Sequence, residues 1–148
     1  MKLKEFLSEN NVILKEYLDS SKPLYDSLGI VLEEMNINND ELNFPALPLP
    51  SLQCYPNVVH GGIVMTFLDI AAGILALANT SEYHSKQVFT KKFECFFKEK
   101  MLVGQVYIVS ASIRNFVEDE MCVFASICKK VGSQNIIIAE GKGVFKMK

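Results

Sequence analysis

The chain has 148 residues, of which 49% are apolar, so it can bury the core of one ordinary domain and is neither disordered nor fibrous. Its 15 Lys and Arg nearly balance its 17 Asp and Glu, giving a net charge of −2 and no broad cationic field for a nucleic acid or an anionic membrane. The spacing of its 4 cysteines and 2 histidines matches no zinc ribbon and no redox Cys-x-x-Cys pair, so we expect free thiols and no metal.

The N-terminal segment predicts an amphipathic helix. Apolar residues recur at helical spacing from Lys2 to about Ser20, and Pro23 is expected to close the segment, which gives an N-terminal helix over residues 1–22. Glu5 and Glu9 precede any sustained apolar stretch, so the segment does not have the features of a secretory signal. We therefore expect a cytoplasmic protein.

The following segment predicts short elements of extended structure. Leu28–Met35 is expected to form a short strand, Asn36–Asp40 a turn, and Glu41–Leu49 a further extended stretch. Prolines at positions 45, 48 and 50 favour an edge strand or a loop for the last of these, because proline has no N–H to donate to a sheet.

A helix is predicted from Gly61 or Gly62 to about Asn79. Its residues are apolar on almost every side, which is typical of a helix in the interior of a domain. The apolar run Ile63–Ala78 is shorter than the roughly 18 to 20 residues of a membrane span, and it contains Asp69. We therefore expect a buried helix and no membrane span.

Four long segments rich in β-branched and aromatic residues predict an antiparallel meander: Lys86–Phe97, Leu102–Arg114, Glu120–Lys130 and Gln134–Phe145. Strict alternation along the first of these places Thr90 on the face opposite to Phe93 and Cys95. The expected fold class is α+β, with a curled antiparallel sheet wrapped around one long central helix and an extra N-terminal helix. No second domain is evident, so residues 1–148 are expected to form a single domain.

The start of the predicted central helix is suited to stabilising an oxyanion. Gly61 and Gly62 allow a ligand to approach the backbone closely, and the unpaired N–H groups of a helix N-terminus favour an oxygen that gains negative charge. Asp69, a carboxylate in an apolar helix, is a candidate general base or nucleophile; alternatively, it is a buried residue held only by hydrogen bonds.

Helix geometry restricts how these residues can cooperate. At a rise of about 1.5 Å per residue, Gly61 and Asp69 lie about 12 Å apart along the helix axis. A general base must be within hydrogen-bond reach of the group it serves, directly or through one water. If both residues act on one carbonyl, the site must combine Gly61 of one chain with Asp69 of a second, which predicts a homodimer with two shared sites.

His60-Gly61-Gly62, followed by Asp69 nine residues after the histidine, resembles the small hotdog-fold thioesterases of the phenylacetate-degradation type. Weaker similarity extends over a hotdog core at residues 24–146, in the segments Leu28-Gly29-Ile30, Thr90–Phe97, Gly104 and Gly141–Phe145.

The resemblance implies an enzyme that hydrolyses acyl-CoA thioesters and forms a homodimer, often a dimer of dimers, without a metal or a redox cofactor. It implies that the Gly61 amide polarises the thioester carbonyl and that Asp69 of the partner subunit activates water or attacks directly. His60 would orient the helix start, and Thr90 would help to place the water or the carboxylate.

The residues before the motif depart from the family pattern. The family commonly has Asn or Asp six residues before the histidine and Gly three before it, where this chain has Cys54 and Asn57. Both positions, with Gly62, are candidate substrate-binding residues. Either Asn57 or Gln53 takes over the polar role, or the pocket is altered and activity is weak. Cys54 itself is more easily explained as a small buried thiol than as a nucleophile activated by His60.

Several other polar residues are weaker candidates. Lys91-Lys92 and Lys98-Glu99-Lys100 can meet the phosphates of coenzyme A or simply face solvent, and the same holds for Arg114. His84, in a polar loop, is expected to be solvated rather than functional. The alternative function is a non-catalytic hotdog protein that binds acyl-CoA or a fatty acyl group. A hydratase of the same fold is the third possibility, but the chain has no suitably close Asp and His pair.

Overall fold

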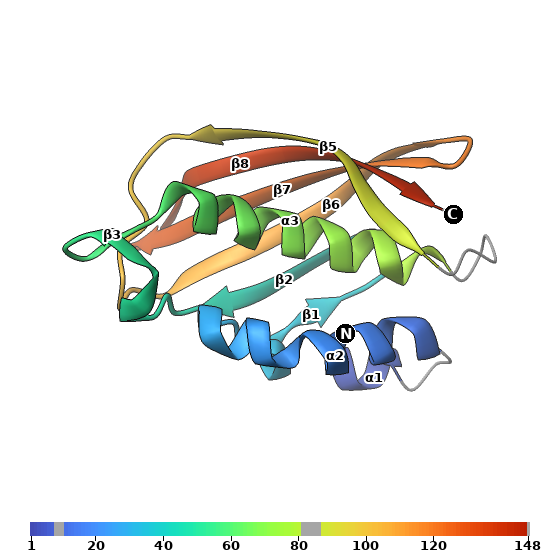
Figure 1. The fold of residues 1–148 in the computed structure, drawn as a ribbon, viewed down its shortest axis with the longest axis horizontal. Coiled ribbons are helices and arrows are strands. Elements are labelled where there is room, and N and C mark those ends of the chain that lie inside the picture. Colours follow the sequence, from blue (N-terminus) through green and yellow to red (C-terminus); the bar gives the residue numbers. More distant parts are fainter. Residues whose placement is uncertain (8–10, 81–86, 148) are drawn as a thin grey trace.

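The computed structural model describes residues 1–7, 11–80 and 87–147. A six-stranded antiparallel sheet in the order β1-β2-β6-β7-β8-β5 curls around one long helix, α3 (Gly61–Ala78) (Figure 1). The strands of this sheet are β1 (Asn36–Ile37), β2 (Glu41–Ala46), β5 (Val88–Phe97), β6 (Tyr107–Val117), β7 (Glu120–Val131) and β8 (Gln134–Met147). The predicted fold class, with its sheet around one central helix, is confirmed.

Helix α3 forms the centre of the core, with bounds close to those predicted. Its apolar residues pack against inward-facing positions of the sheet such as Val109, Val123 and Ala125, which are fully buried. Among the described residues, α3 alone is long and apolar enough to cross a membrane, but 61% of its length is buried inside the domain. It is therefore the core helix of this fold.

One stripe of α3 is open. Gly62, Thr66, Asp69 and Gly73 follow one another at spacings of three or four residues, Met65 lies three residues after Gly62, and each of the five is exposed or half-buried. This spacing places them on a single face of the helix. The central helix therefore presents a partly polar face toward the side of the domain that the sheet does not cover.

Strand β5 lies at the edge of the sheet. A simple meander would place it next to β6, but it pairs with β8 instead. Gly141 and Gly143 of β8 make room for the ring of Phe93, since a Cβ atom at these positions would lie 2.6 Å and 2.8 Å from that ring. The meander prediction is right for β6, β7 and β8 and wrong for β5.

A β-bulge changes the direction of Thr90. The pairing of β5 with β8 shifts between Thr90 and Lys92, so one extra residue is inserted in β5 at this point. An extra residue reverses the alternation of side chains, and Thr90 therefore points toward α3, on the same side as Phe93 and Cys95. The prediction that Thr90 lies on the opposite face is wrong for this reason.

The N-terminal region contains two helices, α1 (Leu3–Leu7) and α2 (Val12–Leu28), where one was predicted. Pro23 lies inside α2 and does not end it. Because Pro23 is exposed, the carbonyl group that loses its donor can bind water, while one apolar face keeps the helix on the domain. The boundary expected between residues 22 and 24 falls within this helix.

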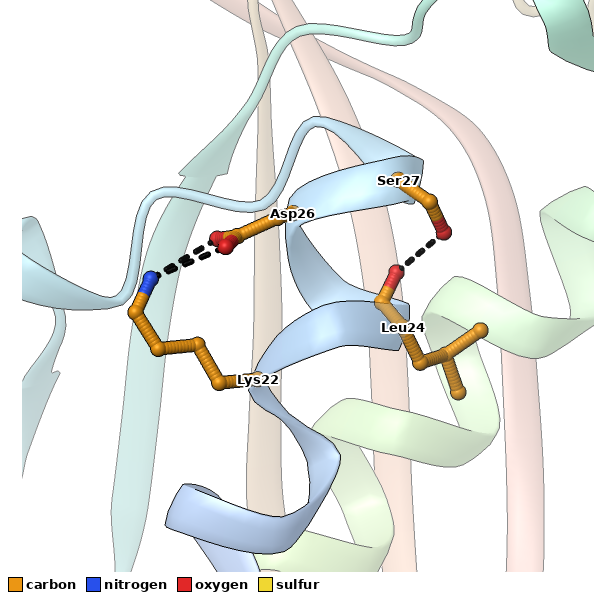
Figure 2. Close-up of polar contacts among 4 residues, drawn as sticks. All are labelled: Lys22, Leu24, Asp26 and Ser27. Carbon is orange, nitrogen blue, oxygen red and sulfur yellow. Dashed lines mark hydrogen bonds and ion pairs between the residues drawn. The ribbon is translucent and has the colours of Figure 1, made fainter.

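The end of α2 is set by local contacts and by Gly29. Lys22 Nζ donates to both carboxylate oxygens of Asp26, at 2.9 and 3.1 Å, and Ser27 Oγ donates to the carbonyl oxygen of Leu24 at 2.7 Å (Figure 2). The ion pair is exposed and adds little stability. Gly29 adopts φ +79°, and a Cβ atom there would lie 1.8 Å from the carbonyl oxygen of Leu47, so only glycine fits.

The segment after α2 differs from the prediction of a short strand. Ile30 forms only an isolated bridge with Ala46, and the 3-10 helix η1 (Leu32–Glu34) follows. Pro45 lies within β2. The short strand β1 pairs only with Leu42 and Asn43 of β2, so β1 does not extend alongside Pro45, as expected for a proline in a strand.

The chain then reaches α3 through a small hairpin and a turn. The 3-10 helix η2 (Pro50–Leu52) precedes β3 (Gln53–Tyr55) and β4 (Val58–Val59), which pair with each other.

Strand β6 begins later than predicted, because Leu102 forms only an isolated bridge with Val58 and Gly104 turns the chain at φ +78°.

Candidate active site

The first turn of α3 carries the motif His60-Gly61-Gly62. His60 is the N-cap residue, and its Nδ1 accepts a hydrogen bond of 3.1 Å from the N–H of Gly62. The N–H of Gly61 has no acceptor among the described residues, and a Cβ atom at Gly61 would meet no other atom within 4 Å. The backbone of Gly61 is therefore accessible and has a free donor at the positive end of a helix.

Asp69 lies two turns further along the open stripe of α3. Thr90 Oγ1, in β5, donates a hydrogen bond of 2.8 Å to Asp69 Oδ1. Asp69 is half-buried, whereas the sequence predicted a buried acid, because the stripe is not covered by the sheet. The hydrogen bond fixes one carboxylate oxygen, and Oδ2 has no donor within residues 1–7, 11–80 and 87–147.

Two other titratable groups lie near Asp69. Burial, followed by the negative charge of Asp69, raises the pKa of the Cys95 thiol. Burial also raises the pKa of the Tyr25 hydroxyl far above its usual value, and Tyr17 and Asp69 add to this effect. Both groups therefore stay neutral at pH 7 and place no charge beside Asp69.

Gly61 and Asp69 open into two different cavities. A cavity of about 720 Å³ lies at the N-terminal end of α3 and is lined by Gly61, Val64 and the segment from Phe97 to Leu102. A second cavity, of about 440 Å³, lies between α2, α3 and β5 and contains Asp69 and Thr90. We call these the Gly61 cavity and the Asp69 cleft. Within one chain, the amide donor and the carboxylate do not face a common space.

The matches to known proteins agree with this architecture. The sequence model of the thioesterase superfamily matches residues 56–133, which include the helix start, Asp69 and Thr90. The chain belongs to the thioesterase superfamily. A search of the curated proteins finds no match.

Solved structures show the same fold at low sequence identity. A thioesterase family protein from Silicibacter pomeroyi is 17% identical, with a TM-score of 0.75 over 91% of this chain and 95% of that protein. The PaaI protein of the Escherichia coli phenylacetic acid degradation operon is 13% identical, with a TM-score of 0.72 over 90% and 94%. A Streptococcus mutans protein bound to acetyl-CoA is 11% identical, with a TM-score of 0.65 over 78% and 87%. The fold of this thioesterase-superfamily domain is the hotdog fold.

The positions at which this superfamily member departs from the resembling thioesterases lie in the β3–β4 hairpin. Asn57 adopts φ +67°, a left-handed conformation that asparagine tolerates better than most residues, which explains how it stands where the family commonly has glycine. Gln53 Oε1 accepts from the Asn57 N–H at 3.0 Å, so Gln53 stabilises the turn. Cys54 is exposed, and the prediction of a buried thiol is wrong because no described residue covers β3.

Most lysines that were considered for coenzyme A are paired with carboxylates. Lys91 pairs with Glu120 and Lys92 with Glu94, whereas Lys100 lines the Gly61 cavity and makes no ion pair with any described residue. Lys98 and Lys129 of the same cavity pair with Glu140 and Glu99. The guanidinium of Arg114 lies 4.8 Å from the centre of the Phe124 ring, on the outer face of the sheet, and His84 falls outside the described residues.

Sequence reasoning missed part of the Asp69 cleft. Helix α2 contributes four lining residues, Ile13, Glu16, Tyr17 and Ser20, and α3 contributes Gly73. The contribution of α2 depends on tertiary packing and left no local signal. Gly73 did leave a local signal, because a glycine in the middle of an apolar helix lowers the stability of the helix and so indicates another role for this position. No group of three or more His, Cys, Asp or Glu that could hold a metal occurs in the part of the chain that the structure describes.

Proposed function

We propose that this protein is an acyl-CoA thioesterase that hydrolyses a thioester to a free acid and coenzyme A. The observation that carries the proposal is the hydrogen bond between Thr90 Oγ1 and Asp69 Oδ1, which holds a carboxylate in an open cleft of a thioesterase-superfamily fold. A positioned carboxylate of this kind can take a proton from water or attack a carbonyl carbon.

We propose that each site combines two chains. Gly61 and Asp69 lie on one helix and open into separate cavities, so a second chain must supply one of them if both act on the same carbonyl. Two features support an association at this face. Strand β5 is an edge strand whose only paired neighbour within residues 1–7, 11–80 and 87–147 is β8, and Met65 on the open stripe of α3 is 39% exposed. The proposed unit is a homodimer, with pairing of dimers as a further possibility for the same chain.

The proposed roles follow from the local geometry. The free N–H of Gly61 donates to the thioester carbonyl oxygen as that oxygen gains negative charge. Asp69 of the partner subunit takes a proton from a water whose oxygen bonds to the carbonyl carbon, or attacks that carbon itself. The carbon–sulfur bond then breaks, and the coenzyme A sulfur leaves with the proton that Asp69 took from water. After direct attack, the sulfur takes its proton from solvent, and water hydrolyses the acyl–Asp69 anhydride to the free acid, which restores the carboxylate. Thr90 keeps the carboxylate in place, and His60 keeps the first turn of α3 in place.

The charges of the Gly61 cavity support coenzyme A as the leaving group. Lys98, Lys100 and Lys129 line this cavity together with a single acid, Glu99. Because Lys100 has no ion pair among the described residues, it is available for a phosphate of coenzyme A. A related fold from Streptococcus mutans has been solved with acetyl-CoA bound, which supports the same ligand class here.

The test is a free-thiol release assay over acyl-CoAs of graded size, with the wild type and the variant Asp69→Asn, which preserves shape and removes the charge. We expect hydrolysis of at least one acyl-CoA by the wild type and its loss in the variant, with an unchanged oligomer and thermal unfolding. An Asp69→Asn protein that turns over at the wild-type rate would contradict the mechanism. Acyl-CoA binding without thiol release would instead indicate the non-catalytic binding protein.

A further inference from the structure

The shape and charge of the Asp69 cleft point to the class of acyl group that it takes. We infer that this cleft is the acyl compartment of the site, that Gly73 gives it depth, and that its two carboxylates, Glu16 and Asp69, restrict it to uncharged acyl groups. The inference rests on the proposed thioesterase function and specifies the substrate class of that same site.

The position of Gly73 argues for a role in shaping the cleft. Gly73 lies one turn beyond Asp69 on the open stripe of α3 and lines the cleft. A glycine inside a helix is less stable than alanine by roughly 0.5–1 kcal/mol. A Cβ atom at Gly73 would lie 3.7 Å from the Phe145 ring, which is an ordinary contact, so packing of the chain does not require glycine here. What glycine provides is open space directly beside the carboxylate.

Helix α2 forms the opposite wall of the cleft. The side chain of Asn11 caps α2 at Leu14 and also donates to the carbonyl oxygen of Ala78, which joins the start of α2 to the end of α3. This contact sets the two helices side by side in opposite directions (Figure 1). Glu16 of α2 and Asp69 of α3 both line the cleft. The wall that faces the reacting carboxylate is thus built by residues outside the segment that matches the superfamily model.

The lining of the cleft combines apolar contact with negative charge. The lining supplies apolar surface from Ile13, Ile70, Leu77, Val88, Phe89 and Phe145, and among the described residues no Lys or Arg lines the cleft. An aliphatic or aromatic acyl group gains by burial against this surface. A terminal carboxylate on the acyl group would enter beside Glu16 and Asp69 without a cation to pair with, and two like charges at close range repel.

Gly73→Leu and Gly73→Ala test the depth of the cleft. We expect Gly73→Leu to lower kcat/KM at least about tenfold for long acyl-CoAs, while the shortest acyl-CoA that the wild type hydrolyses changes by less than about twofold. Gly73→Ala should show a smaller shift in the same direction and unfold at an equal or higher temperature, because alanine favours the helix. Loss of long-chain activity in a variant of raised stability cannot be ascribed to misfolding.

Butyryl-CoA and succinyl-CoA test the charge restriction, since their acyl groups have the same number of carbons and differ by a terminal carboxylate. We expect the wild type to prefer butyryl-CoA by at least about tenfold in kcat/KM. Glu16→Gln should reduce this preference about threefold, a modest change because Glu16 is exposed to solvent, and Glu16→Lys should reduce it further. The matched control is Asp19→Asn, one turn along α2 on the face that borders a different cavity.

The outcomes separate the inference from the function on which it rests. The inference would be overturned, and the thioesterase proposal would stand, if the protein hydrolyses acyl-CoAs but Gly73→Leu does not change the chain-length profile. Equal hydrolysis of succinyl-CoA and butyryl-CoA would have the same consequence. Failure of the wild type to hydrolyse any acyl-CoA would overturn both.

Discussion

The two ends of the proposed chemistry lie on the same helix but in contrasting surroundings. The first turn of α3 is exposed, offers the backbone N–H of Gly61, and opens into a cavity lined by lysines. In the middle of α3, the half-buried carboxylate of Asp69 opens into a cleft that no described lysine or arginine lines. A cationic cavity suits the phosphates of coenzyme A, and an apolar cleft suits an acyl group. The contrast indicates that each chain carries two complementary halves of a site rather than one whole site.

The largest effect is expected at the carboxylate. Asp69→Asn keeps the volume of the side chain and can still accept a hydrogen bond from Thr90. It removes the base, so kcat should fall roughly 10²- to 10⁴-fold. The measurement is steady-state thiol release with the best acyl-CoA. The control is Glu120→Gln, which removes the β7 carboxylate that pairs with Lys91 and should keep the wild-type rate.

The donor at the helix start can be removed without removing the helix. Gly61→Pro deletes the N–H, and proline is well accepted at the first position of a helix after a residue such as His60, whose φ −58° and ψ 136° suit a following proline. We expect kcat to fall roughly 10²- to 10³-fold, as for the loss of one oxyanion donor.

Gly61→Ala is the matched control for this change. It retains the N–H, and its Cβ atom would meet nothing within 4 Å. Alanine should therefore preserve most of the activity. Equal activities of the proline and alanine variants would show that the Gly61 amide takes no part in the reaction.

A smaller effect is expected at the residue that holds the carboxylate. Thr90→Val keeps the shape of the side chain and removes the donor to Asp69 Oδ1, which should lower kcat about tenfold, the equivalent of one hydrogen bond to a charged group. Thr90→Ser should restore most of the loss. A valine variant as active as the wild type beside a less active serine variant would show that the methyl group rather than the hydroxyl is what matters at this position.

The smallest effect is expected at the cap of α3. His60→Ala removes the acceptor for the Gly62 N–H and should lower the free energy of unfolding by about 1 kcal/mol. His60→Asn supplies another capping acceptor and should recover much of that stability. Urea unfolding of the three proteins checks this, and a histidine variant that loses activity but no stability would assign His60 to the chemistry instead.

The sequence was sufficient for the parts of the fold that repeat a simple pattern. The limits of α3 and the succession of β6, β7 and β8 follow from hydrophobic periodicity and turn residues. Local patterns could not reveal that β5 crosses to the far edge of the sheet, because that position depends on two glycines in β8 that accommodate Phe93.

The site was predictable to a similar extent. His60, Gly61 and Asp69 could be chosen as candidates because their spacing is local to one helix. The direction of Thr90 could not be derived by counting residues, since the bulge before Lys92 reverses the alternation. Pro23 likewise was expected to end a helix that continues, because the buried face of α2 outweighs one lost hydrogen bond.

The most direct test of a site shared between chains is to mix two inactive variants, Asp69→Asn and Gly61→Pro, under conditions that allow subunits to exchange. A mixed dimer would contain one site with an intact Gly61 and an intact Asp69 and one site with neither. Because half of the dimers in an equal mixture are mixed, about a quarter of the wild-type activity should return. If each site lay within a single chain, the mixture would stay as inactive as its two components.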